Sequence, residues 1–256
     1  MTYAFERRRY RKDNYAYLLA AGEDAALVDP GDPDVARAMA AALGLSPRWI
    51  LHTHGHADHT GGSARLRAET GARVLGHAAD AAWFPPDEDV SGRRELALGA
   101  LRIGVVPVPG HTPGSVVYLW EGRAFTGDTL FWGGCGNCRH GGDVDALARS
   151  LAGPVAALDG ALRVHPGHDY AALNLPFALA LEPGNADARA RLEAVQAAHA
   201  AGREPEAPTL DEERRSNPFL RTHVPDVRDA IEGRAPGTGP DAASRVAALR
   251  RIRDTW

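Results

Sequence analysis

The first two thirds of the chain alternate between short apolar runs and stretches rich in alanine. Several of the apolar runs end at Gly, Pro or Asp, as expected for buried strands that close in tight turns. Residues 35–43, 64–70 and 143–151 have the composition of helices, and Asp143 is a suitable capping residue for the last of them. This pattern predicts a mixed α/β domain. Its strands are expected over residues 15–20, 25–28, 48–51, 73–75, 101–106, 115–119, 124–126 and 163–165.

The character of the sequence changes after about residue 173. Residues 185–195 begin with a capping asparagine and contain mainly good helix formers, and residues 242–253 are also helical in pattern. We therefore expect two units, an α/β catalytic domain over residues 1–173 and a small helical domain over residues 174–256.

Composition narrows the class of protein without naming a function. The chain is 44% hydrophobic and has no apolar run near the ~18 residues that span a bilayer. Its first ten residues lead into no apolar signal segment, and two cysteines favour a reducing compartment over a disulfide framework. A net charge of −4 argues against a general nucleic-acid binder. We expect a cytoplasmic monomer with no membrane or nucleic-acid partner.

Four of the 11 histidines and one aspartate lie within residues 51–62, directly after an apolar run. Burying so many ionisable groups together costs free energy unless something compensates, and a metal ion would do so. In an extended or looped segment His54, His56 and Asp58 alternate and can point the same way, whereas His59 points elsewhere. Imidazole and carboxylate groups are zinc ligands, so this division favours two metal ions over one.

Three further potential ligands follow glycine residues far along the chain. His111, Asp128 and His168 each come after a short apolar strand and a glycine, which lets the backbone turn sharply towards a site. Together with the histidine-rich run, these loops predict one metal centre built from distant segments. His52 is expected to pack beside it. The remaining histidines are expected to be structural or on the surface: His77, His140, His165, His199 and His223.

Segments 53–59, 110–114, 127–128 and 167–168 together resemble the metallo-β-lactamase superfamily. The resemblance implies an αββα sandwich with a dinuclear site at one edge. Further blocks resemble its glyoxalase II (hydroxyacylglutathione hydrolase) family, and those in the helical tail separate this family from β-lactamases and shorter thioesterase-like relatives. The blocks are Asp13-Asn14-Tyr15, Val28-Asp29-Pro30-Gly31-Asp32, Gly134-Cys135-Gly136, Gly167-His168-Asp169-Tyr170, Asn174-Leu175, Glu182-Pro183-Gly184-Asn185 and Asn217-Pro218-Phe219-Leu220-Arg221.

The resemblance also implies a ligand set of three residues for each metal ion and one carboxylate shared by both. The implied ligands are His54, His56 and His111 for the first ion, Asp58, His59 and His168 for the second, and Asp128 for both. The family uses zinc and tolerates iron or manganese, so we expect two divalent ions, with zinc preferred. Asp58 is also the expected proton-transfer residue, although a metal ligand is a poor base.

The implied reaction is hydrolysis of S-(2-hydroxyacyl)glutathione thioesters, typically S-D-lactoylglutathione, to glutathione and a 2-hydroxy acid such as D-lactate. This reaction is the second step of methylglyoxal detoxification. A hydroxide formed at the two metal ions would attack the thioester carbonyl, so no serine or cysteine nucleophile is required.

The expected substrate contacts follow the family pattern only in part. Tyr170 and Arg221 match positions that bind glutathione in the family. In the loop after Gly134-Cys135-Gly136, Asn137 replaces a basic residue and Arg139 replaces an aromatic one. Because the arginine fork suits a carboxylate, Arg139 could take over an anion contact. Glutathione affinity could therefore be weaker than in the family, or the thiol carrier could differ.

Other functions stay open from the sequence alone. The spacing Cys135-x-x-Cys138 also suits a redox pair or a zinc site, which would make the protein a redox-responsive binding module. A different hydrolase of the same fold, acting on another thioester, a lactone or a β-lactam, is possible, as is an iron persulfide dioxygenase. A nuclease of this fold would need a basic surface.

Overall fold

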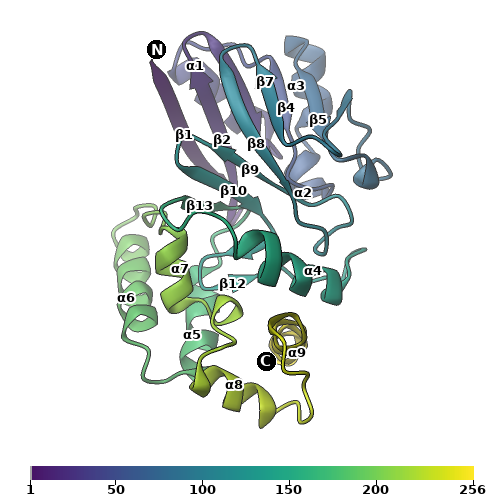
Figure 1. Cartoon of the computed structure of the whole chain (residues 1–256). Helices are drawn as coiled ribbons and strands as arrows, with labels where there is room; N and C mark the ends of the chain where they lie inside the picture. The colour runs from purple at the N-terminus through teal and green to yellow at the C-terminus, as the bar shows by residue number, and fades with distance from the viewer. Residues whose placement is uncertain (1) are drawn as a thin grey trace.

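The computed structural model describes residues 2–256 and places two β-sheets face to face (Figure 1). The first sheet has six strands, and its spatial order is the order in the sequence. β1, β2 and β3 pair antiparallel, and β4, β5 and β6 then add in parallel. The strands are β1 Tyr3–Tyr10, β2 Asn14–Ala21, β3 Asp24–Val28, β4 Trp49–Leu51, β5 Arg73–Gly76 and β6 Glu88–Asp89.

The second sheet has five strands in the order β13-β10-β9-β8-β7. Only the β10–β13 pair is parallel. A separate two-stranded ribbon, β11–β12, leads from this sheet towards the helices that follow. The strands are β7 Glu95–Leu98, β8 Leu101–Pro107, β9 Val116–Trp120, β10 Arg123–Gly127, β11 Leu130–Phe131, β12 Gly134–Cys135 and β13 Arg163–Pro166.

Strand β2 explains how the layers are held together. Tyr15, Tyr17 and Leu19 contribute to the large core between the sheets. The alternate residues, such as Leu18, pack in a second core with helices α1 (Pro33–Ala42) and α3 (Ser63–Thr70). Because both faces are covered, β2 is buried along its whole length and reads as a continuous apolar run.

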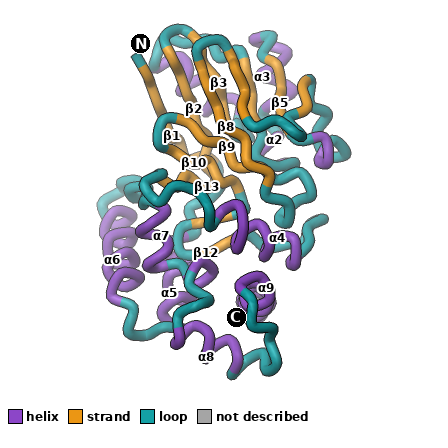
Figure 2. The backbone as a smooth tube through the Cα atoms, viewed as in Figure 1, coloured by secondary structure: helices purple, strands orange, loops and turns teal. Residues whose placement is uncertain are grey.

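The C-terminal part of the chain is helical and lies below the sheets in Figures 1 and 2. It joins the core between the sheets through buried side chains such as Leu175, Phe177 and Leu249. Across residues 2–256, no helix has the length and apolar character needed to cross a membrane. The remaining helices are α2 Ala57–Thr60, α4 Val144–Ser150, α5 Ala171–Leu181, α6 Ala186–Ala200, α7 Leu210–Ser216, α8 Pro225–Glu232 and α9 Ala242–Thr255.

The predicted strands and helices are confirmed, and two of the elements that the pattern missed, β1 and α5, were missed for different physical reasons. Strand β1 reads as charged because it is an edge strand whose arginine stems pack against the sheet, as Arg7 does over the Tyr15 ring. Helix α5 is apolar nearly all round and contains Pro176, so it shows no helical period. The domain boundary expected after residue 173 falls inside this helix.

Candidate metal centre

The histidine-rich segment follows β4, and its two halves adopt different conformations. His54 and His56 lie in a loop, whereas Asp58 and His59 lie in the one-turn helix α2. The expectation that His54, His56 and Asp58 alternate along one extended segment is therefore wrong after His56. The helical turn instead brings Asp58 and His59 into the same group of potential ligands.

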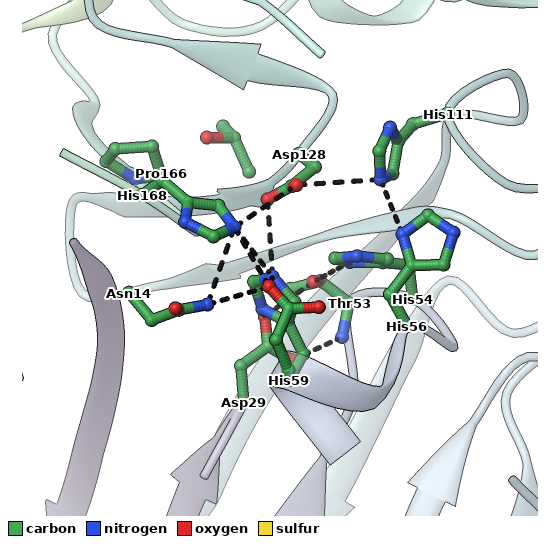
Figure 3. A network of polar contacts seen from close by, with 12 residues as sticks. Asn14, Asp29, Thr53, His54, His56, His59, His111, Asp128, Pro166 and His168 are labelled. Atoms are coloured by element: carbon green, nitrogen blue, oxygen red, sulfur yellow. Dashed lines mark hydrogen bonds and ion pairs between the residues drawn. The ribbon is translucent and has the colours of Figure 1, made fainter. Parts of the chain in front are cut away.

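Distant loops complete two groups of three potential ligands, which we call the first and second triads (Figure 3). In each triad the facing nitrogen and oxygen atoms lie within 4.8 Å of one another. His111 comes from the loop after β8, and His168 comes from the loop after β13. The first triad is His54, His56 and His111; the second is Asp58, His59 and His168.

The carboxylate of Asp128, at the end of β10, lies between the two triads. Its Oδ2 is 3.5 Å from His111 Nε2 in the first triad and 3.4 Å from His168 Nε2 in the second. Its Oδ1 is 3.5 Å from His59 Nε2 and has no hydrogen bond, although the atom is buried. One carboxylate is therefore within reach of a cation in either triad.

In the first triad, hydrogen bonds fix the tautomers of His56 and His111. The ring nitrogen that points away from the triad holds the proton, so the nitrogen that points into the triad has none. His111 Nδ1 donates to the carbonyl of Asn137 at 2.6 Å, and His56 Nε2 donates to the carbonyl of His140 at 3.0 Å. In the neutral rings, the inner atoms His111 Nε2 and His56 Nδ1 then both carry lone pairs, yet they are 2.9 Å apart. His54 Nε2 is buried beside them without a partner. A cation between these nitrogens satisfies all three.

The second triad has the same arrangement around carboxylates. His59 Nδ1 contacts Asp29 at 3.2 Å and His168 Nδ1 contacts Asp13 at 2.8 Å, while their inner Nε2 atoms are 3.2 Å apart. Carboxylate partners on the outer nitrogen are typical of metal-binding histidines, because they fix the tautomer and the ring orientation.

The carboxylates around the second triad favour a positive charge on His168, which a bound cation would replace. Burial lowers the pKa of His168, but the Asp128, Asp58 and Asp13 carboxylates outweigh it and raise that pKa to about 11. Burial raises the pKa of Asp128, yet His168 and His59 hold it well below its usual range. Without metal, a proton on His168 balances the carboxylates, and a divalent cation would displace it.

Two buried aspartates hold the ligand loops in place. Asp29 accepts hydrogen bonds from the Thr53 backbone N–H at 2.9 Å and from its hydroxyl at 2.6 Å. Asp80 accepts from the Gly55 N–H at 2.8 Å and the Thr112 hydroxyl at 2.6 Å. Asp29 lies in one of the family-like blocks, whereas no sequence pattern singled out Asp80. A lone acidic residue in an alanine-rich segment gives no signal until the fold places it beside Gly55.

His52 packs as predicted. Its ring is buried, with Nε2 2.6 Å from the Ser63 hydroxyl and Nδ1 3.6 Å from Asp29. It therefore supports Asp29 and belongs to neither triad.

Comparison with known proteins identifies the family. Residues 9–168 match the Metallo-beta-lactamase superfamily, and residues 169–256 match the Hydroxyacylglutathione hydrolase C-terminus. The chain is 66% identical over 253 residues to the hydroxyacylglutathione hydrolase of Anaeromyxobacter dehalogenans (strain 2CP-C), with 98% of each chain covered. The chain belongs to the hydroxyacylglutathione hydrolase family of the metallo-β-lactamase superfamily. Membership implies two divalent metal ions, and the two triads fit that requirement.

Solved structures agree on the fold. The crystal structure of ETHE1 from Myxococcus xanthus has a TM-score of 0.67 and 27% identity, covering 97% of this chain and 99% of that one. TTHA1623 in a di-iron-bound form has a TM-score of 0.59 and 30% identity, covering 81% of this chain and 95% of that one. The αββα sandwich and the helical C-terminal domain expected of this family are both present.

A groove opens beside the second triad of this hydroxyacylglutathione hydrolase family member. The Tyr170 ring stacks on His168, with centroids 4.7 Å apart and an interplanar angle of 5°, and so connects the groove to the metal centre. Of the four expected substrate contacts, the groove brings together Tyr170, Asn137 and Arg139. Its lining residues are Phe131, Cys135, Asn137, Arg139, Tyr170, Leu173, Asn174, Arg250, Arg253, Asp254 and Trp256.

The fourth expected contact, Arg221, is not brought to this groove. Its guanidinium pairs with both carboxylate oxygens of Glu182, Nη2 at 2.6 Å and Nε at 2.9 Å. Asn185 donates to the same carboxylate at 2.9 Å. The Glu-Pro-Gly-Asn and Asn-Pro-Phe-x-Arg blocks are therefore joined to each other through Arg221, and the contact of Arg221 with substrate stays a prediction.

Two arginines of α9, Arg250 and Arg253, line this groove in addition to Arg139. Arg250 donates to the Cys135 carbonyl at 3.0 Å and to the Asp254 carboxylate at 2.9 Å. Arg253 lies over the Trp256 ring, 5.1 Å from its centroid. Their spacing of three residues places them on one face of the helix. This spacing is visible in the sequence, but the sequence does not show that this face lines a groove.

The altered loop connects the groove to the first triad. Arg139 donates to the Asp254 backbone carbonyl at 2.8 Å, which ties the loop to the end of α9. The carbonyls of Asn137 and His140 in this loop are the ones that hold His111 and His56. Arg139 therefore has a local structural partner in addition to its place in the groove lining.

The two cysteines are not activated thiols. Both are free, and burial raises the pKa of Cys135 to about 11 and that of Cys138 to about 12. A reactive cysteine needs a lowered pKa, so the environment argues against a redox pair.

Proposed function

We propose that this protein hydrolyses S-(2-hydroxyacyl)glutathione thioesters, with S-D-lactoylglutathione as the reference substrate, to glutathione and a 2-hydroxy acid. The observation that carries the proposal is the pairing of two largely buried ligand triads around Asp128 with an adjoining groove that contains arginines. The curated relative named hydroxyacylglutathione hydrolase, 66% identical, supports the substrate class.

The proposed ligands are His54, His56 and His111 for one ion, Asp58, His59 and His168 for the other, and Asp128 for both. We propose zinc, because imidazole and carboxylate ligands suit it. Iron is the first alternative to test, since TTHA1623 binds a pair of iron ions. When bound, two such cations lower the pKa of water and polarise a carbonyl oxygen.

The chain's own side chains supply position and charge. Arg250 and Arg253 would hold the carboxylates of the thiol carrier, and Tyr170 would direct its sulfur end towards the triads. Asp58 is the proposed proton acceptor, since its side chain is 33% exposed whereas that of Asp128 is 10% exposed. Burial raises its pKa, but His168 and His59 lower it well below the usual range, so its basicity is weak.

The proposed setting is the cytoplasm, with the protein acting as a monomer. Both cysteines are free thiols, as suits a reducing compartment. One chain provides both triads and the groove, so no second subunit is needed to complete the site. Sedimentation velocity of the metal-loaded protein tests the monomer.

The substrate assay compares S-D-lactoylglutathione with D-lactoyl esters of other thiols. We expect hydrolysis of the glutathione ester with a kcat/KM at least about tenfold higher. A preference for another thiol would show that the groove has a different carrier. Oxygen uptake with glutathione persulfide, in place of hydrolysis, would contradict the proposed reaction.

The metal assay tests the triads directly. We expect about two divalent ions per chain and loss of thioester hydrolysis in His54→Ala, because that ring has its inner nitrogen buried in the first triad. His223→Ala, an exposed histidine outside both triads, is the matched control. Full activity in metal-free protein would overturn the assignment.

A further inference from the structure

The exposed side chain of Trp83 lies beside the first triad and is neither a potential metal ligand nor part of the groove lining. The Trp83 ring centroid is 5.7 Å from that of His56, with the rings inclined at 64°. Trp83 is 44% exposed. It is one of five exposed large hydrophobic residues in the described part of the chain, and two others, Leu173 and Trp256, line the groove. An exposed tryptophan next to a candidate metal ligand favours ligand binding over chance exposure.

The segment that carries Trp83 is fixed relative to the metal centre. The Trp83 backbone N–H donates to the Asp80 carbonyl at 2.9 Å, and the Asp80 carboxylate accepts from Gly55, between two first-triad histidines. The next residue, Phe84, is buried, and its ring meets His52 edge-on at 4.8 Å. The backbone on both sides of Trp83 is therefore attached to the structure around the first triad.

Two glycines make room for the indole. A Cβ atom on Gly55 would lie 2.8 Å from Trp83 Cε3, and one on Gly141 would lie 2.7 Å from Cζ2. Both approaches are too close for any side chain, so the indole packs against bare backbone on these sides. Gly141 also has a φ of 90°, which favours glycine. The ring is therefore oriented by its surroundings, and part of its surface stays open to solvent.

Trp83 and the groove lie against different triads. The groove meets the second triad through Tyr170 and Phe131, whose rings are 4.7 Å and 6.0 Å from that of His168. Trp83 meets the first triad through His56. A thioester with its carrier in the groove and its carbonyl between the triads would therefore direct its acyl substituent past the first triad.

We propose that Trp83 forms the acyl subsite, and that it favours 2-hydroxyacyl thioesters with an aromatic or large apolar substituent. The inference rests on the proposed function, because it needs the carrier in the groove. An indole face stacks with an aromatic substituent and covers apolar surface, whereas a methyl group as small as that of lactate covers little of it. Trp83 thus adds selectivity between acyl groups and supplies no catalytic group.

The test compares two acyl groups on one carrier, S-D-mandeloylglutathione and S-D-lactoylglutathione, with the metal-loaded enzyme. Trp83→Ala should lower the mandeloyl-to-lactoyl ratio of kcat/KM roughly tenfold, through a higher KM for the mandeloyl ester. Trp83→Phe should retain most of the ratio. Leu43→Ala removes another exposed apolar side chain, at the end of α1, and should leave the ratio unchanged.

Metal content measured on each variant separates selectivity from structural support. An unchanged ratio in Trp83→Ala overturns the proposal, and so does an equal loss for both esters accompanied by loss of metal. If the wild-type enzyme cleaves no glutathione thioester, the proposed function fails on its own. The same acyl pair on the thiol that the enzyme does accept then decides the role of Trp83.

Discussion

The buried side chain of His165 links the stability of the sheet core to pH. Its ring stacks on Phe125 at 5.4 Å, is buried, and has neither nitrogen hydrogen-bonded. Burial, together with the charges of Arg7, Arg123 and Arg163, lowers its pKa to about 3. The folded protein therefore keeps this imidazole neutral at a pH where the unfolded chain binds a proton.

The consequence is a contribution to acid sensitivity. Between about pH 6.5 and pH 3 the unfolded state binds more protons at this residue, so the free energy of unfolding falls as the pH falls. His165→Leu should remove this contribution. On going from pH 7.5 to pH 4.5, the free energy of unfolding of the variant should rise by roughly 2–3 kcal/mol relative to that of the wild type.

Urea unfolding at the two pH values measures this difference, with His223→Gln as the exposed control. A wild-type-minus-variant difference that is the same at both pH values would show that His165 does not titrate in this way.

At the scale of elements, the helical domain is held together by the polar residues of its family blocks. The Glu182–Arg221 pair joins the end of α5 to the turn after α7, and both side chains are mostly buried, with 11% and 17% exposed. The loop at residues 137–140 has the corresponding role at the metal centre, because it joins α9 to the first triad. In both connections an arginine that the sequence pattern marks as a substrate contact, Arg221 or Arg139, bonds to another part of the protein.

Two arginine substitutions should therefore separate structure from binding. Arg221→Ala leaves the Glu182 carboxylate without its cation and should lower the free energy of unfolding by about 3 kcal/mol. Its KM for the thioester should stay within about twofold of wild type. Arg253→Ala, in the groove, should raise KM about tenfold with a smaller loss of stability.

Denaturant unfolding and steady-state kinetics on the same two preparations give both numbers. The opposite assignment, a large KM effect in Arg221→Ala and none in Arg253→Ala, would place the carrier elsewhere.

At the scale of the whole molecule, the metal centre joins segments that the sheets bring together. The triads and Asp128 come from the ends of β4, β10 and β13 and from the loop after β8, which belong to both sheets. Bound cations would therefore stabilise the contact between the sheets as well as the site. Without them, the inner nitrogens of His56 and His111 face each other at 2.9 Å.

Metal removal should accordingly lower the melting temperature of the whole sandwich. Zinc at about a thousandfold excess over its Kd should restore roughly 4 kcal/mol, because it binds the folded state far better than the unfolded one. Thermal unfolding after chelation, followed by titration with zinc, measures the shift, and His168→Ala should reduce it. A melting temperature that does not respond to metal would contradict ligand sets assembled across the two sheets.

The sequence by itself determined which residues could bind metal and most of the elements that present them. His54, His56, His111, Asp128 and His168 could be selected because ligand chemistry restricts the residue types and because a glycine precedes each of the three distant residues. The strands could be predicted because burial on both faces leaves continuous apolar runs.

Only the tertiary structure decided which polar residues act on one another across the chain. The sequence pattern singled out Arg221 and not Arg250 or Arg253. The fold pairs Arg221 with Glu182 and places the other two arginines in the lining of the groove. Likewise, only the packing of the fold places Asp80 beside Gly55 and Trp83 beside His56. The reason is physical: residue type fixes what a side chain can bind, whereas distances between segments far apart in sequence depend on how the two sheets and the helices pack.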